Sequence, residues 1–204
     1  MPQFTDLTGL LGIASVISAI VMMLPGIARF STLHKGILLS LVFVLVLMPL
    51  GELPLAAYVR GATGDLSITT LVLIWGGLLH RWCGLASVDA KQRDALLTVV
   101  TLIAVALYPL SLGVGMFDPY RYGFACVAFI IALFIIALTA WIRRSDLIAL
   151  CIALAAFAWS IGWYESSNLW DYLVDPFLAI YAVWVIAFSM KKHCFKRQPK
   201  EAKR

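Results

Sequence analysis

Residues 122–142 read YGFACVAFIIALFIIALTAWI, and Arg143 and Arg144 follow directly. The run has no charged residue, and its length matches the about 20 mostly apolar residues that a helix needs to cross a bilayer. Two arginines beside one end of such a helix are typical of its cytoplasmic side. The stretch therefore predicts a membrane-spanning helix and the direction in which it runs.

Similar apolar runs fill most of the chain. Apolar residues make up 62% of the 204 residues and charged residues 13%, whereas a soluble domain has about 25% charged residues. The candidate spans are 8–29, 37–58, 66–82, 95–114, 122–142, 147–163 and 174–190. We expect an all-α bundle of seven transmembrane helices over residues 1–190, followed by a basic cytoplasmic tail over residues 191–204.

The third run, Leu66 to Trp82, is short and contains Gly76-Gly77, so a re-entrant hairpin is an alternative to full crossing. Without that crossing, Lys91 and Arg93 would lie on the same side as the charge-poor loop that holds Arg60. Short cytoplasmic loops are rich in Lys and Arg, so the charges favour full crossing.

Seven crossings sort the basic residues onto one side. Only Arg60 and Arg121 fall on the other side, out of 16 Lys and Arg residues. The N-terminus is therefore predicted outside and the C-terminus in the cytoplasm of a multi-pass plasma-membrane protein. Small size and short loops favour a bacterial inner membrane. The first run has no basic segment before it and no small-residue cleavage site, so we expect it to be retained.

The tail, residues 191–204, reads KKHCFKRQPKEAKR and accounts for the formal charge of +5. Basic residues just inside a membrane attract anionic lipid, so we expect the bilayer and its anionic lipids as partners. Nucleic acid is not expected, because no aromatic interleaving or recognised module accompanies the tail.

Aspartates recur where the predicted helices begin. A carboxylate at such a position accepts a bond from a free backbone N–H and suits the positive end of the helix dipole. Two of them precede proline, which is favoured at the first helical position. The predicted structural caps are Asp6, Asp65, Asp94, Asp118, Asp146 and Asp175.

Small residues gather on two runs. The first run carries Gly9, Gly12, Ser15 and Ser18, and the sixth carries Ala149, Ala153 and Ala156 on roughly one face. Such residues let membrane helices approach closely. These helices are predicted either to be central in the bundle or to receive another protein.

Glu52 is the one ionisable residue within the runs that capping or a place at a helix end does not explain, and it lies between Pro49-Leu50-Gly51 and Leu53-Pro54. A carboxylate at membrane depth is a functional hypothesis by default, and a broken helix beside it is typical of transporter sites. The alternative is that the helix ends at Pro49 and that Glu52 lies in an interfacial turn, where it could pair with Arg60.

The most polar outer stretch is residues 163–172, WYESSNLWDY. Its Glu165 and Asp171 have no clear capping role. A candidate polar site at the outer face therefore consists of Glu52, Arg60, Arg121, Glu165 and Asp171. The preferred interpretation is an ordered loop held by salt bridges, and a pocket for a headgroup, sugar or peptide is the alternative.

Catalytic and cofactor motifs are missing from the sequence. It has no G-x-S-x-G, H-E-x-x-H, phosphate-binding glycine loop or C-x-x-C, so no metal or cofactor is expected. The histidines His34, His80 and His193 all fall at the inner boundary. A haem held by the first two is a remote alternative.

Three function classes follow, in order of preference. The first is a non-catalytic subunit or accessory factor of a membrane or envelope complex, with a membrane protein as partner. The second is a small transporter or channel that uses Glu52 as a proton- or cation-linked carboxylate. The third is an enzyme acting on a lipid-linked substrate at the outer face, with Glu52, Glu165 or Asp171 as acid or base.

Overall fold

A computed structural model describes residues 4–49 and 51–201, and the side chains of residues 6–49 and 51–191. Within these residues all regular structure is helical, as predicted. The α-helices are α1 (Phe4–Met22), α2 (Thr32–Leu47), α3 (Leu55–Thr63), α4 (Ile68–Cys83), α5 (Ala90–Ser111), α6 (Val127–Ile142), α7 (Asp146–Ser160), α8 (Leu169–Leu173) and α9 (Pro176–Glu201), with short 3-10 turns η1 (Ile27–Arg29) and η2 (Pro119–Gly123).

Length together with apolar composition sets α5 apart from the other helices. Among the described residues, α5 alone is long and apolar enough to cross a membrane by length and composition. The other apolar helices are shorter: Asp6–Met22, Thr32–Leu47, Ile68–Cys83, Val127–Ile142, Asp146–Ser160 and Pro176–Lys191. Length and composition thus support one crossing, and each of the seven predicted runs contains one long helix.

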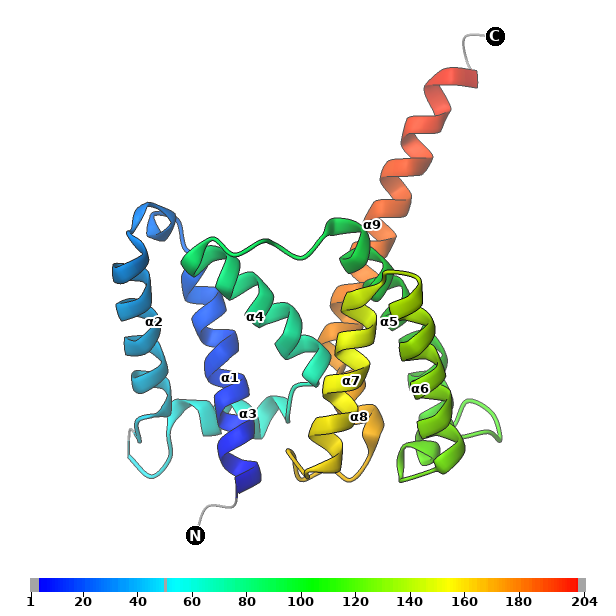
Figure 1. Ribbon diagram of the computed structural model, residues 1–204, viewed down its shortest axis with the longest axis horizontal. Coiled ribbons are helices and arrows are strands. Elements are labelled where there is room, and N and C mark those ends of the chain that lie inside the picture. The colour runs from blue at the N-terminus through cyan, green and yellow to red at the C-terminus, as the bar shows by residue number, and fades with distance from the viewer. Residues whose placement is uncertain (1–3, 50, 202–204) are drawn as a thin grey trace.

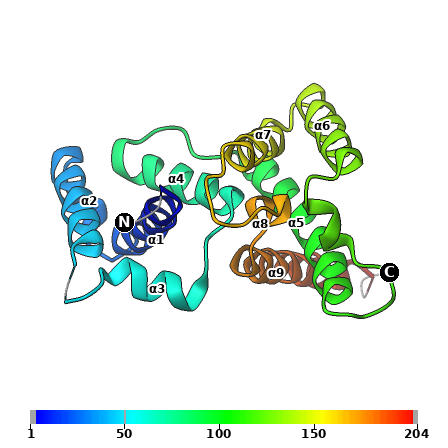
Figure 2. The same ribbon diagram turned by 90° about the horizontal axis from the view of Figure 1, so that it is seen from below.

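The long helices lie side by side, and their connections gather at two ends (Figure 1). One end, called the Arg60 end below, holds the start of α1 together with α3, η2 and α8. The opposite end, called the tail end, holds the turns after α1, α4 and α6, and α9 projects beyond it. Seen from below, α1–α4 form one half of the molecule and α5–α9 the other (Figure 2).

The second apolar run is split into two helices. The helix α2 ends at Leu47 and α3 begins at Leu55, with an isolated bridge between Pro49 and Pro54. Proline lacks the N–H that a helix needs and disfavours helical geometry in the residue before it. Glu52 therefore lies in an exposed turn at the Arg60 end rather than inside a broken transmembrane helix.

The third run forms one continuous helix. Its first cap is Ser67, whose hydroxyl accepts the Thr70 N–H, and its last is Gly84, in the left-handed conformation at φ 70°. Glycine takes that conformation without steric cost. The hairpin considered for Gly76-Gly77 is absent, because α4 continues through both residues.

The molecule has two apolar cores, one in each half. The larger core joins α5, α7, α8 and α9 around Leu97, Ala155 and Tyr172, all 0% exposed. The smaller core joins α1, α2 and α3 around Ala14 and Ala56. Helix α4 contacts both α1 and α7 and thereby connects the two halves.

Candidate functional site

Arg60 is the centre of an ionic cluster at the Arg60 end. Its Nε donates to Asp65 Oδ1 at 2.6 Å and its Nη2 to Asp65 Oδ2 at 3.1 Å. Its Nη1 donates to Asp6 at 3.0 Å, and Nη2 also reaches Glu165 at 3.2 Å. One guanidinium therefore binds three carboxylates, which come from α1, the α3–α4 loop and the α7–α8 loop.

The ionic cluster is only partly exposed to solvent, which strengthens its ion pairs. The Arg60 side chain is 16% exposed, whereas that of Glu165 is 62% exposed. Hydrogen bonding to Asp65 is the main reason that the pKa of Arg60 is raised, and it outweighs the opposing effect of burial. Charge-assisted, forked contacts of this kind are the strong ones. Three acids against one arginine leave the cluster with an excess of negative charge.

A cavity of about 610 Å³ lies beside this cluster. Arg60, Asp6, Asp65 and Glu165 line it together with apolar and glycine residues of α1 and α3. Because the carboxylates already bind Arg60, the cavity wall is formed by groups whose charges are partly neutralised. The arrangement fits the predicted loop held by salt bridges.

Three predicted members, Glu52, Arg121 and Asp171, lie outside the cluster. Glu52 lies in the exposed turn before α3, and the suggested pair between Glu52 and Arg60 does not form, since Arg60 binds the other three acids. Arg121 lies exposed in η2. Of the residues predicted for the site, Arg60 and Glu165 are in contact. Asp6 and Asp65, which also bind Arg60, were not among the predicted site residues.

Asp171 organises a second polar group, in the C-terminal half. It accepts the Tyr120 hydroxyl at 2.9 and 3.0 Å on its two oxygens, and the Ser166 hydroxyl binds it as well. Burial, and then this hydrogen bond, raise the pKa of Tyr120. The fully buried Asn168 donates to the Tyr120 carbonyl at 3.0 Å. These bonds fix the loop after α7 against η2.

Asp175 is a buried carboxylate, 3% exposed, between two helix starts. One oxygen accepts the Leu178 N–H at 2.8 Å and so caps α9. The other accepts the Ser67 N–H at 2.9 Å, the Ser67 hydroxyl at 2.7 Å and the Thr70 hydroxyl. The side chain is therefore satisfied by donors from α4 and α9 and ties the two halves together.

The predicted caps are met in part. Asp175 caps α9 as predicted. Asp118 instead caps the short turn η2 by accepting the Tyr120 N–H at 3.0 Å, and the helix that it was predicted to cap, α6, starts after Cys126. Asp6 lies in the first turn of α1 and binds Arg60.

The other predicted caps are displaced by a few residues. Three helices start after residues other than the predicted Asp65, Asp94 and Asp146, namely after Ser67, Asp89 and Ser145. Asp65 is held by Arg60, so the nearer hydroxyl of Ser67 takes the capping position of α4. Asp146 is the first residue inside α7, where its charge still suits the helix dipole.

The small residues of α1 allow close contacts with the ionic cluster. A methyl group added at Gly9 would overlap the Arg60 guanidinium and the Asp65 carboxylate, whereas one at Gly12 would only touch Leu71 at 3.7 Å. Close approach at Gly9 is thus needed for the ion pair. Helix α1 contacts α2, α3 and α4, as expected for a central helix of its half.

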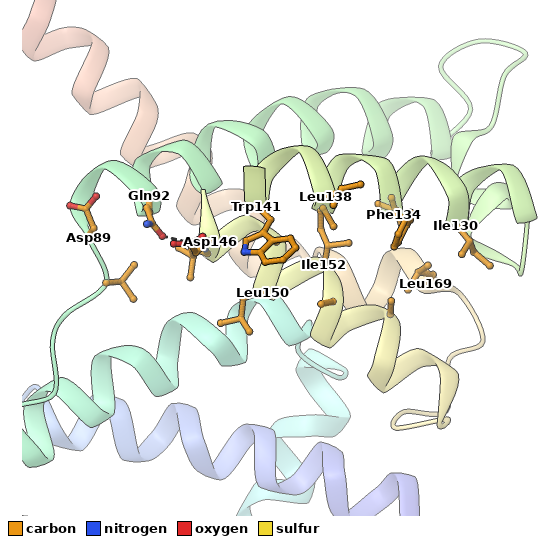
Figure 3. A pocket seen from close by; sticks show the side chains of 17 residues that line it. Asp89, Gln92, Ile130, Phe134, Leu138, Trp141, Asp146, Leu150, Ile152 and Leu169 are labelled. Carbon is orange, nitrogen blue, oxygen red and sulfur yellow. Dashed lines mark hydrogen bonds between the residues drawn. The ribbon is translucent and has the colours of Figure 1, made fainter. Parts of the chain in front are cut away.

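The alanines of α7 have a different environment. Ala149, Ala153 and Ala156 line an open groove of about 940 Å³ between α6 and α7. Figure 3 shows Asp89, Gln92 and Asp146 at one end of the groove and Ile130 and Leu169 toward the other, with Trp141 and Phe134 along it. The groove is apolar along its length and acidic at its tail-end mouth.

His34 and His80 each make a local hydrogen bond. His34 binds the Ser31 hydroxyl at 2.7 Å, and His80 lies 2.7 Å from the Leu85 carbonyl. No group of three His, Cys, Asp or Glu side chains in this part of the chain could hold a metal ion.

Sequence reasoning missed the partners of Arg60 and Asp175 for different reasons. Asp65 lies five residues after Arg60, on the far side of a helix end, so the local spacing offered a signal. Nothing local connects Ser67 with Asp175, which are 108 residues apart. No family model, curated protein or solved structure matches this chain.

Proposed function

We propose that the chain is a seven-span membrane protein with the Arg60 end outside and the tail end in the cytoplasm. The apolar outer surface supports this proposal. In α6 only Leu133 is buried, while Val127, Phe134 and Trp141 are each at least 65% exposed. Apolar patches of this extent are rare on soluble monomers, and lipid would cover them.

Short helices are compatible with crossing. A helix of 16 residues such as α6 is about 24 Å long, against a hydrocarbon core of about 30 Å. Residues 122–126, which precede α6, add Tyr122, Phe124 and Ala125 to the apolar length. Bilayers also thin locally around short spans at modest cost.

The distribution of charge supports the orientation. Arg60 lies in α3 and Arg121 in η2, both at the Arg60 end (Figure 1). The basic residues at the tail end are Arg29, Lys35, Arg81, Lys91, Arg93, Arg143, Arg144 and Lys191. Cytoplasmic loops carry such an excess of Lys and Arg.

Within the membrane, we infer that the protein acts as a non-catalytic subunit or accessory factor that receives a transmembrane helix of a partner. The groove between α6 and α7 is the observation that carries this inference. Its alanines allow a second backbone to approach. The carboxylates of Asp89 and Asp146 at its cytoplasmic mouth complement the Lys and Arg residues that follow most spanning helices.

The alternatives have less structural support. Glu52, on which the transport hypothesis rests, lies in an exposed turn and lines neither the cavity beside Arg60 nor the groove between α6 and α7. Glu165 and Asp171, the acids of the enzyme hypothesis, are bound to Arg60 and Tyr120. Groups engaged in this way stabilise the outer face.

Purification from native membranes in mild detergent tests the accessory role. The expected result is one membrane protein at fixed stoichiometry, which cross-links to a photoreactive residue placed at Ala153. Ala153→Trp should fill the groove and release this partner. Ile180→Trp on α9, where Ile180 is 69% exposed, is the matched control and should retain it.

Recovery of the protein alone and monodisperse would contradict the accessory role. If Ala153→Trp retains the partner, the partner contacts another surface and the groove is not its binding site.

A further inference from the structure

A second groove lies where the two halves of the molecule meet, between α1, α4 and α9. Its volume is about 530 Å³. Apolar residues such as Ile13, Ile20 and Ile74 line most of it. The polar side chains in its lining are Thr63 and Thr70 toward the Arg60 end, Arg81 toward the tail end, and Tyr181 on α9.

The length of this groove suits a single acyl chain. Thr70 and Arg81 lie on the same helix, α4, and both line the groove. Their separation of 11 residues corresponds to about 16 Å along the helix axis. The hydrocarbon core of a bilayer is about 30 Å thick, so the groove covers about half of it.

The inner mouth of the groove is basic. Arg81 is exposed there, and Lys35 donates from Nζ to the Arg81 carbonyl at 3.1 Å, which holds a second cation beside it. Neither side chain has an acidic partner within ion-pair distance in the described part of the chain. Two unpaired cations therefore face the cytoplasmic membrane surface.

The outer end of the groove has no charged side chain in its lining. The Thr70 hydroxyl is already bound to Asp175. A ligand that extended this far would meet a satisfied polar network and would gain no hydrogen bond there. The groove therefore suits a ligand with an apolar tail and an anionic head group at one end only.

We propose that this groove binds an anionic phospholipid of the cytoplasmic leaflet, with an acyl chain along α4 and the phosphate at Arg81 and Lys35. Basic pockets between membrane helices on the cytoplasmic side favour such headgroups. Gly77 leaves room for the chain, because an added methyl group there would meet no atom within 4 Å. The inference rests on the membrane insertion proposed above, and the lipid is a partner distinct from the helix proposed for the α6–α7 groove.

Native mass spectrometry of the purified full chain, with phosphatidylglycerol or phosphatidylcholine of identical acyl chains, tests this site. Wild type should bind phosphatidylglycerol more tightly. Arg81→Gln should weaken that binding about fivefold, because one basic residue near a membrane surface contributes about 1 kcal/mol. Arg143→Gln, at the same end but outside the groove, is the matched control and should leave binding unchanged.

Gly77→Leu tests the acyl chain. It should reduce the binding of both lipids, whereas Gly61→Leu, also in open space but on α3, should not. If Gly77→Leu does not fold, Ala19→Leu on the facing wall of the groove replaces it. Glycerol phosphate without acyl chains should compete poorly, which distinguishes a lipid site from a phosphate site.

Equal binding of the two lipids by wild type, or full phosphatidylglycerol binding by Gly77→Leu, would overturn the proposal. Resistance to alkaline carbonate extraction is measured in parallel. A chain that is extracted from membranes would contradict membrane insertion itself, whereas an inserted chain without lipid preference would contradict the lipid site alone.

Discussion

Arg60 and Asp65 form a forked ion pair, with Nε to Oδ1 at 2.6 Å and Nη2 to Oδ2 at 3.1 Å. The pair closes the end of α3 onto the start of α4. The same guanidinium reaches Glu165, which lies 105 residues later in the chain. One side chain thus links the N-terminal half to the C-terminal half at the Arg60 end.

Removal of this guanidinium should destabilise the protein strongly. Arg60→Ala leaves Asp6, Asp65 and Glu165 close together without a cation. Partly buried carboxylates that lose their cation lower the free energy of unfolding by about 2 kcal/mol or more. We expect a clear fall in the thermal midpoint in detergent. Arg121→Ala, at an exposed arginine of the same face, is the control and should change stability by less than about 0.5 kcal/mol. Equal effects of the two variants would contradict the role of Arg60.

Two glycines on α1 provide a matched test of the same pair. Gly9→Ala should push Arg60 from Asp65, because the new methyl group overlaps both side chains. Gly12→Ala places the same group at an ordinary distance of 3.7 Å from Leu71, and alanine favours a helix over glycine by about 1 kcal/mol. Thermal melting should show Gly9→Ala destabilised and Gly12→Ala unchanged or stabilised. A stabilised Gly9→Ala would show that the close approach is not needed.

Asp175 should be more costly to replace than an exposed cap. Asp175→Ala leaves buried donors of Ser67 and Leu178 unpaired, which costs about 3 kcal/mol in total. Asp118→Ala removes an exposed cap and should cost about 1 kcal/mol. The measurement is the fraction of monodisperse protein after heating in detergent. Similar losses for both variants would rule out a connecting role for Asp175.

Alkaline pH should weaken the contact between Tyr120 and Asp171. The pKa of Tyr120 is raised above its ordinary value of about 10, so the neutral phenol stabilises the folded state. That contribution is fully present below about pH 10 and is lost as the pH rises toward the folded-state pKa.

Comparison of Tyr120→Phe with wild type isolates this contribution. The variant should be less stable at neutral pH by about 1 kcal/mol, because one hydrogen bond is lost. It should then lose less of its thermal midpoint than wild type when the pH is raised above about 10. Equal alkaline losses in the two proteins would contradict the assignment.

The positions of the helices followed from the sequence because apolar runs and helix breakers are local signals. Each predicted run contains a helix, and the Pro49 to Pro54 segment interrupts the second run, as proline chemistry requires. Helix lengths were less predictable. The helices within the predicted runs 8–29 and 37–58 end at Met22 and Leu47, because apolar residues also occupy the turns that follow.

The candidate site followed from the sequence only in part, because its partners are brought together by packing. The predicted outer-face group contained Arg60 and Glu165, which do meet. Asp65 was assigned to a cap, since its position before α4 resembles one. The pairing of Ser67 with Asp175 depends on how α4 and α9 pack, which local sequence does not encode.

The central claim is that the chain crosses the membrane seven times, and accessibility of single cysteines tests it most directly. The native cysteines to be replaced by serine are Cys83, Cys126, Cys151 and Cys194. An impermeant maleimide is then applied to intact cells with single cysteines at Ala62, in α3, or Ala86, in the α4–α5 linker, both exposed. The account predicts that Ala62→Cys is labelled from outside and that Ala86→Cys is labelled only after the membrane is opened. Labelling of both Ala62→Cys and Ala86→Cys in intact cells would show that α4 does not cross, and would contradict the seven-span arrangement.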